Sequence, residues 1–169
     1  IGLGGVGVSA LLASLYMKVK HIDVLEKNSF KINHFKKLVK SKSINYFKKD
    51  NFLKKNYYSL VVETSGNVKM ISKSMDFITT KGKVIFASHP SFRSKILLNP
   101  FDLISGKKIF GTWGGEIKFS NDLKILTRII KKFKNISKVF FNKTYKLAQI
   151  NSAINDFSQG KVIRPLIKF

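Results

Sequence analysis

Apolar residues fall into two alternating patterns along most of this chain. Longer blocks carry them at helical spacing, and the shorter stretches between these blocks are apolar runs typical of buried strands. This alternation predicts a parallel sheet with helices on both faces. The expected elements are helices at residues 6–15, 29–39 and 68–79, and strands at 21–25, 44–47, 59–63, 83–87 and 107–111, with Ser29 as a helix cap.

The pattern changes after about residue 115. The stretch 121–134 predicts an amphipathic helix, because its apolar side chains form one stripe. A short strand at 139–141, a helix at 147–158 and a closing strand at 162–169 are expected to follow. Pro165 indicates an edge position or a bulge in the closing strand. We therefore expect two parts, residues 1–112 and residues 113–169.

The glycines at the start of the chain form a G-x-G-x-x-G motif made of Gly2, Gly4 and Gly7, and Glu26 ends the next expected strand. This is the spacing of a dinucleotide-binding βαβ unit. Gly4 would let a pyrophosphate approach the backbone at a helix N-terminus, where free N–H groups favour negative charge. Glycines also serve ordinary turns, but the surrounding helix and strand favour a nucleotide site. Residues 1–112 are thus predicted to be a dinucleotide-binding Rossmann domain.

A buried strand normally leads into such a glycine loop, and only Ile1 stands in its place. The predicted fold is therefore a Rossmann-like α/β fold, a doubly wound parallel sheet whose first strand is truncated. We expect the chain to be the C-terminal part of a longer protein, with residues 113–169 returning toward the rest of it. No signal peptide or long apolar run is visible, so we expect a cytoplasmic protein without a membrane partner.

The net charge is +23, which invites a nucleic-acid interpretation. Lysine supplies nearly all of this charge, however, and only three arginines occur, although arginine is favoured for base and phosphate recognition. The lysines are spread over the whole chain, so no specific nucleic-acid partner is predicted. Cysteine is absent, and the three histidines lack metal-ligand spacing, so no metal site is predicted within this chain.

Taken together, these residues resemble the C-terminal half of the medium-chain, zinc-type alcohol dehydrogenases. The matching segments keep the family's order and lie close to its spacing over nearly the whole chain. They are the glycine motif, Glu26 with Lys31, Glu-Thr-Ser-Gly at 63–66, the segment 111–115, and Ser-Gln-Gly-Lys-Val-Ile-Arg-Pro at 158–165.

The resemblance implies cofactor contacts but no catalytic residue and no metal ligand in this chain. It assigns the pyrophosphate loop to Gly2, Gly4, Gly5, Val6 and Gly7, the adenosine ribose to Glu26 and Lys31, the adenosine side to Ser65 and Gly66, the nicotinamide side to Ala87, Ser88 and Trp113, and a further pyrophosphate contact to Arg164. In the family, Cys and His ligands in the N-terminal domain hold the zinc. Zinc would therefore belong only to the parent protein.

The implied activity is hydride transfer between a nicotinamide and an alcohol or polyol. NAD is expected rather than NADP, because the carboxylate of Glu26 would repel a 2′-phosphate. The family often forms homo-oligomers through the sheet edge near residues 96–110. Two alternatives remain open: an adenylyltransferase of the ubiquitin-activating-like class, which needs an arginine that residues 27–40 lack, and a non-catalytic nucleotide-binding fragment.

Overall fold

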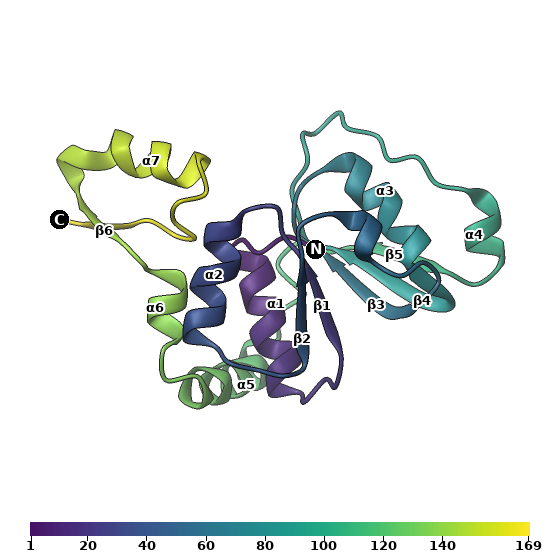
Figure 1. The fold of residues 1–169 in the computed structure, drawn as a ribbon, viewed down its shortest axis with the longest axis horizontal. Coiled ribbons are helices and arrows are strands. Elements are labelled where there is room, and N and C mark those ends of the chain that lie inside the picture. The colour runs from purple at the N-terminus through teal and green to yellow at the C-terminus, as the bar shows by residue number, and fades with distance from the viewer.

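The computed structural model describes residues 1–169 as short parallel sheets covered by helices (Figure 1). The helices are α1 (Gly5–Tyr16), α2 (Ser29–Leu38), α3 (Val68–Phe77), α4 (Pro100–Ile104), α5 (Phe119–Lys132), α6 (Ile136–Phe140) and α7 (Ile150–Ser158), with single 3₁₀ turns η1 (Asp50–Phe52) and η2 (Leu147–Gln149). The strands are β1 (Ile22–Leu25), β2 (Ile44–Phe47), β3 (Tyr58–Glu63), β4 (Ile78–Phe86), β5 (Lys108–Gly111), β6 (Thr144–Lys146) and β7 (Leu166–Lys168).

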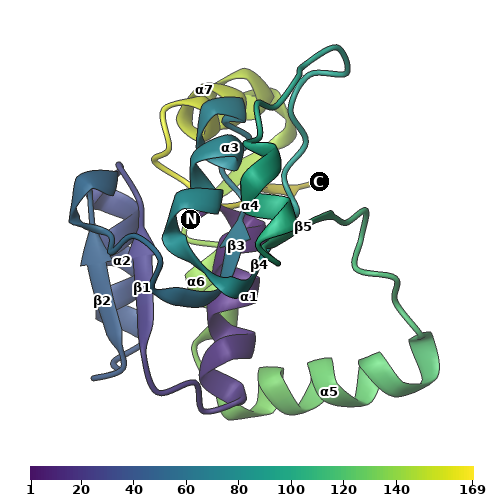
Figure 2. The same ribbon diagram turned by 90° about the vertical axis from the view of Figure 1, so that its right-hand side faces the viewer.

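The strands pair in parallel, and helices cover both faces, so the predicted Rossmann-like α/β fold is confirmed. β1 pairs with β2, and β3, β4 and β5 form a second sheet in that order. One core joins α1 and α2 to β1 and β2, and α5 and α6 add Ile129 and Val139 to it. The other core joins α3 to β3 and β4. Figure 2 shows α5 lying across the end of α1.

The last third of the chain has a small lobe of its own, in which β6 pairs with β7 beside α7 (Figure 1). Its core is small and consists of Tyr145, Ala153 and Val162. Because α5 and α6 instead pack on the core of α1 and α2, residues 113–169 contribute to both regions. The division at residues 112 and 113 stays a prediction.

The two main sheets are not joined as one, because β1 and β3 do not pair with each other. The backbone of the first residues bridges them at one end. The N–H of Gly2 donates to the carbonyl of Leu25 at 2.8 Å, and the N–H of Thr64 donates to the carbonyl of Ile1 at 2.9 Å. This is the position at which a doubly wound sheet carries its first strand.

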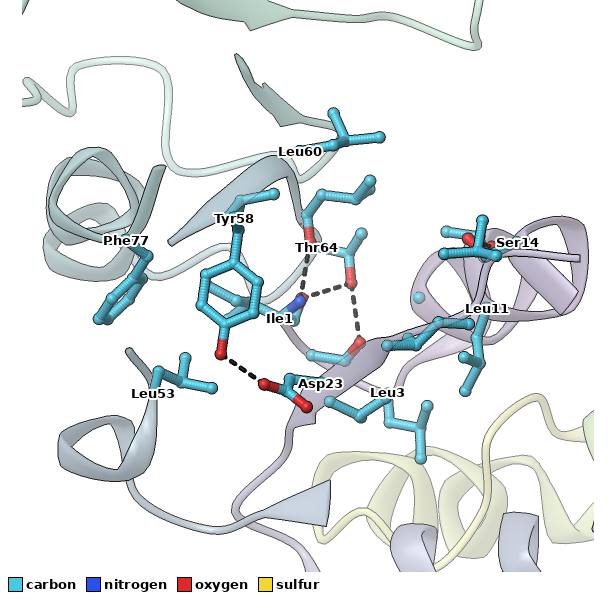
Figure 3. Close-up of a pocket in the computed structure, with 18 of the residues that line it drawn as sticks. Ile1, Leu3, Leu11, Ser14, Asp23, Leu53, Tyr58, Leu60, Thr64 and Phe77 are labelled. Atoms are coloured by element: carbon cyan, nitrogen blue, oxygen red, sulfur yellow. Dashed lines mark hydrogen bonds between the residues drawn. The ribbon is translucent and has the colours of Figure 1, made fainter. Parts of the chain in front are cut away.

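A cavity of about 280 Å³ fills the remaining space between β1 and β3 (Figure 3). Its lining is mostly apolar and includes Leu11, Leu53 and Phe77. At the far end from Ile1, the Tyr58 hydroxyl donates to Asp23 at 2.5 Å and bridges the two strands. Burial opposes ionisation of Asp23, but hydrogen bonds from Tyr58, Asn45 and His21 outweigh it and hold the pKa of this carboxyl below its ordinary value.

Several predicted boundaries need correction. Asn28, not Ser29, caps α2, because its side chain accepts from the N–H groups of Phe30 and Lys31 at 2.8 and 3.3 Å. The helix predicted at 68–79 ends at Phe77, and β4 starts at the next residue with an irregular register opposite Tyr58. The short helix α4 was not expected from the pattern.

The strand predicted at 139–141 is wrong. Residues Ile136–Phe140 form the helix α6, because Ile136, Val139 and Phe140 lie at helical spacing and pack on the core of α1 and α2. The closing strand is also shorter than predicted, since β7 begins only after Pro165. Proline lacks the N–H that a strand ladder needs, which agrees with this late start.

Candidate cofactor-binding site

The glycine loop runs from the gap between the sheets into α1, as its spacing predicts. Gly2 has a φ of +86°, in the left-handed region that glycine adopts without strain. The Thr64 hydroxyl donates to the carbonyls of Ile1 and Gly2 at 2.9 and 3.1 Å and holds this turn against the end of β3. A Cβ built on Gly7 would overlap the Gly2 carbonyl oxygen. The loop therefore needs glycine at positions 2 and 7.

Gly4 faces open space at the start of α1. A Cβ built on it would meet no atom within 4 Å, unlike one built on Gly7. Gly4 caps α1 without any side-chain hydrogen bond, so the first-turn N–H groups of the helix have no partner from a capping side chain. Free N–H groups and the positive end of the helix dipole together form an anion-binding position.

The guanidinium of Arg164 lies against this helix start. A Cβ built on Gly5 would lie 2.6 Å from its Nε atom, so a side chain at this position would push the guanidinium aside. The backbone N–H of Arg164 donates to the carbonyl of Phe140 at 3.1 Å, which fixes the segment that carries it. A residue far away in sequence thus adds positive charge beside the glycine loop.

Glu26 follows β1 directly, and its carboxylate ties two backbone segments together. Oε2 accepts from the N–H of Leu3 at 2.7 Å, and Oε1 accepts from the N–H of Asn28 at 2.8 Å. Each carboxylate oxygen can accept more than one hydrogen bond, so both retain capacity for a ligand hydroxyl. Glu26 therefore shapes the loop and faces the adjoining cavity.

That cavity has a volume of about 620 Å³ and opens in front of the glycine loop. It brings together five of the predicted residues, which are Gly2, Gly4, Glu26, Lys31 and Ser65. Lys27, Lys48 and Lys49 also line it, so its wall is rich in positive charge. A polar cavity with cationic walls suits a ligand that carries phosphate groups.

The turn after β3 and the end of β4 form the neighbouring rim. Gly66 has a φ of +72°, and a Cβ built on it would lie 4.0 Å from Cβ of Ser88, so the two predicted residues are close. The N–H of Ala87 donates to the carbonyl of Glu63 at 2.8 Å. Asn67 caps α3 by accepting from the N–H of Met70 at 3.2 Å.

Trp113 stands apart from the cavity described above. Its side chain is 84% exposed, which rules out a core role, and its ring meets the edge of His89 at a centroid distance of 4.4 Å. Gly66, Ala87, Ser88, Trp113 and Arg164 do not line the 620 Å³ cavity. The assignment of Trp113 to the nicotinamide side stays a prediction.

Two residues of this region escaped the sequence analysis. Asn28 donates to the carbonyl of Gly160 at 3.1 Å and so links α2 to the C-terminal segment. Its signal was present, because asparagine before a helical stretch is a favoured cap. Glu63 appeared only as part of a matching segment, because its partners lie on two different turns and cannot be found from spacing.

No three His, Cys, Asp or Glu side chains converge as metal ligands would. None of the helices combines the length with the apolar character that crossing a bilayer requires.

Comparison with known proteins finds similarity in sequence and fold to dehydrogenases. No model of a known protein family matches the sequence. The chain is 23% identical over 176 residues to S-(hydroxymethyl)glutathione dehydrogenase of a Synechocystis species, and the match covers 99% of this chain but 48% of that relative. The chain thus spans about half the length of this curated relative.

Solved structures of alcohol dehydrogenases have a similar fold over about half of their length. Benzyl alcohol dehydrogenase of Acinetobacter calcoaceticus superposes with a TM-score of 0.85 at 23% identity, over 99% of this chain and 48% of the other. A short chain alcohol dehydrogenase of Escherichia coli, solved with NADH, superposes with a TM-score of 0.77 at 14% identity, over 99% and 50% of the two chains. The chain therefore shares its fold with about half of each of these enzymes, in line with the sequence resemblance.

Proposed function

We propose that this chain is the cofactor-binding portion of an NAD(P)-dependent oxidoreductase that acts on an alcohol or polyol by hydride transfer. The open position at Gly4, directly before the N-terminus of α1, is the observation that carries this proposal. Arg164 and the lysine-rich cavity support it, because a pyrophosphate needs positive charge at this point.

The residues present fit a dinucleotide that extends from the cavity across the glycine loop. The first-turn N–H groups of α1 would bind the pyrophosphate, and Arg164 would neutralise part of its charge. Glu26 would accept hydrogen bonds from the adenosine ribose, with Lys31 beside it. Ser65 and Gly66 would line the adenosine side, and Ala87, Ser88 and Trp113 the nicotinamide side. A bound nicotinamide would supply the hydride chemistry at its C4 atom.

No catalytic residue is assigned to this chain, so its own task in this proposal is binding and orientation. Zinc, if the whole protein uses it, would have to be held by other residues, since the ligands here do not converge. The cofactor proposal is tested by titrating the whole protein with NADH and following nicotinamide fluorescence. Micromolar to millimolar affinity is the typical range for such a substrate, and absence of saturable binding would reject the proposal.

NAD rather than NADP is the proposed cofactor, and Glu26 is the residue that would decide it. In the whole protein, replacing Glu26 by alanine should lower the ratio of NAD affinity to NADP affinity by on the order of tenfold. The reason is that the substitution removes the repulsion between the Glu26 carboxylate and the 2′-phosphate of NADP. The paired variant Lys31→Ala should increase the preference for NAD over NADP, because it removes a cation that would attract the 2′-phosphate. Affinities for both cofactors are measured by calorimetry. Tighter binding of NADP than NAD by the unmodified protein would show that the role given to Glu26 is mistaken.

A second copy of the chain is the proposed protein partner. β5 pairs only with β4, so its other edge is free. Apolar side chains near this edge are largely exposed, among them Phe101, Ile104 and Phe110. Exposed apolar side chains beside an unpaired strand edge are typical of an interface. Sedimentation of the whole protein would measure the oligomeric state.

The two alternatives receive no support from a specific observation. The proteins compared above are dehydrogenases, and residues 27–40, which include α2, contain no arginine of the kind that an adenylyltransferase needs. A purely non-catalytic role would be favoured if the whole protein bound NADH tightly but oxidised no alcohol.

A further inference from the structure

Glu63 is a carboxylate with no exposed surface, and it lies at the end of β3 beside the proposed cofactor site. One of its oxygens accepts from the backbone N–H of Ser65 at 2.7 Å and from the Ser65 hydroxyl. The other accepts from the Ser88 hydroxyl at 2.6 Å. Ser65 belongs to the turn after β3, whereas Ser88 follows β4. One side chain therefore holds two separate turns.

These contacts distinguish Glu63 from an ordinary packing residue. Its carboxylate forms no ion pair with any lysine, arginine or histidine side chain. A buried carboxyl group that no side-chain cation pairs with needs hydrogen bonds to replace its lost hydration. Glu63 obtains them only while both turns stay in their present positions. A displacement of either turn would leave a buried carboxylate oxygen without its partner, so the carboxylate favours one relative placement of the two.

The geometry points to Glu63 as a positioning residue that sets the nicotinamide side of the site relative to the adenosine side. This inference rests on the proposed function, in which Ser65 and Gly66 line the adenosine side and Ala87 and Ser88 line the nicotinamide side. Glu63 itself is fully buried. It acts through Ser65 and Ser88, which it holds at a fixed separation across the ends of β3 and β4.

The test compares binding of NADH with binding of ADP-ribose, which lacks the nicotinamide. In the whole protein, Glu63→Ala should weaken NADH binding about tenfold or more, because the hydrogen bonds that fix the nicotinamide side relative to the adenosine side are lost. Affinity for ADP-ribose should stay within about twofold of the unmodified protein. Glu63→Gln should restore NADH binding, because its amide can accept from the Ser65 N–H and donate to the Ser88 hydroxyl.

A double-mutant cycle identifies the path of the effect. Ser88→Ala removes one of the two links and leaves the Ser65 contacts in place, so it keeps the inference testable even if Glu63→Ala fails to fold. In the cycle, Ser88→Ala should cause little further loss of NADH affinity in the Glu63→Ala background, because both changes break the same hydrogen bond. Ser105→Ala is the matched control, since its hydroxyl donates to the carbonyl of Asp102, away from both turns.

The outcomes separate this inference from the proposed function. If the unmodified protein fails to bind NADH, the proposed function falls. If it binds NADH and Glu63→Ala binds both ligands as well as it does, the inference about Glu63 is overturned. An equal loss for NADH and ADP-ribose would also overturn it, because that would indicate a general structural role. Fully additive effects of Glu63→Ala and Ser88→Ala would overturn the link through Ser88.

Discussion

Replacing Gly4 by valine should lower the affinity for NADH by about 100-fold or more and leave the fold intact. The expected loss corresponds to about two charge-assisted hydrogen bonds between phosphate oxygens and backbone N–H groups, each worth roughly 1.5–3 kcal/mol. Gly4 has φ −83° and ψ −168°, which valine adopts readily, and a Cβ there meets no atom of the chain within 4 Å. The branched side chain would therefore fill only the space that the pyrophosphate needs.

A second substitution in the same loop provides the matched comparison. Gly7→Ala should destabilise the protein by about 1–3 kcal/mol, because its Cβ would overlap the Gly2 carbonyl oxygen. Gly4→Val should cost only about 1 kcal/mol, which reflects the poorer capping residue. NADH titration and thermal unfolding of both variants separate the two effects. Unchanged NADH affinity in Gly4→Val, with an intact circular dichroism spectrum, would contradict the proposed site.

The glycine loop and Glu26 were predictable because their signal lies in a short stretch of sequence. A glycine spacing defines the turn, and an acidic residue ends the next strand, so local pattern suffices. Both hydrogen-bond partners of the Glu26 carboxylate, the N–H groups of Leu3 and Asn28, lie within the same βαβ unit as the glycine motif. Arg164 is distant in sequence and could be assigned only through the family resemblance.

The contacts of Glu63 could not be predicted in the same way. They depend on the parallel pairing of β3 with β4, which brings the turns after both strands to one edge of the sheet. Sequence order gives neither the register of that pairing nor the direction of a buried side chain. A buried carboxylate in an apolar strand is the only available signal, and it does not name its partners.

The error at α6 has a different origin. Val139, Phe140 and Phe141 are consecutive residues that favour strands, so a window of this length predicts one. The helical period becomes visible only when Ile136 is included, and the packing of these side chains on the first core decides the outcome. Short apolar runs are ambiguous between helix and strand for this reason.

The gap between β1 and β3 should accept one additional apolar strand. Adding a Val-Ile-Val-Val segment before Ile1 should stabilise the 169-residue chain by about 3 kcal/mol, as a strand that enters the 280 Å³ cavity and the gap around it. Burial of each apolar side chain contributes about 1.5–3 kcal/mol, and ordering each residue costs about 1–2 kcal/mol, so the net gain is a fraction of the total burial. For a chain of this size, the melting temperature should rise by about 6–12 °C.

The expected strand has a defined place and direction. Ile1 and Gly2 already bond to the ends of β3 and β1, so a segment before Ile1 would continue between these strands in parallel with both. Side chains on both faces would be buried, which is why an uninterrupted apolar run is used and not an alternating one. An Asn-Ser-Asn-Ser extension of equal length is the control, because it adds the same backbone without apolar side chains. Equal melting temperatures for the two extended chains would show that the cavity does not accept a strand, and that the separation of the two sheets is a stable feature of this fold.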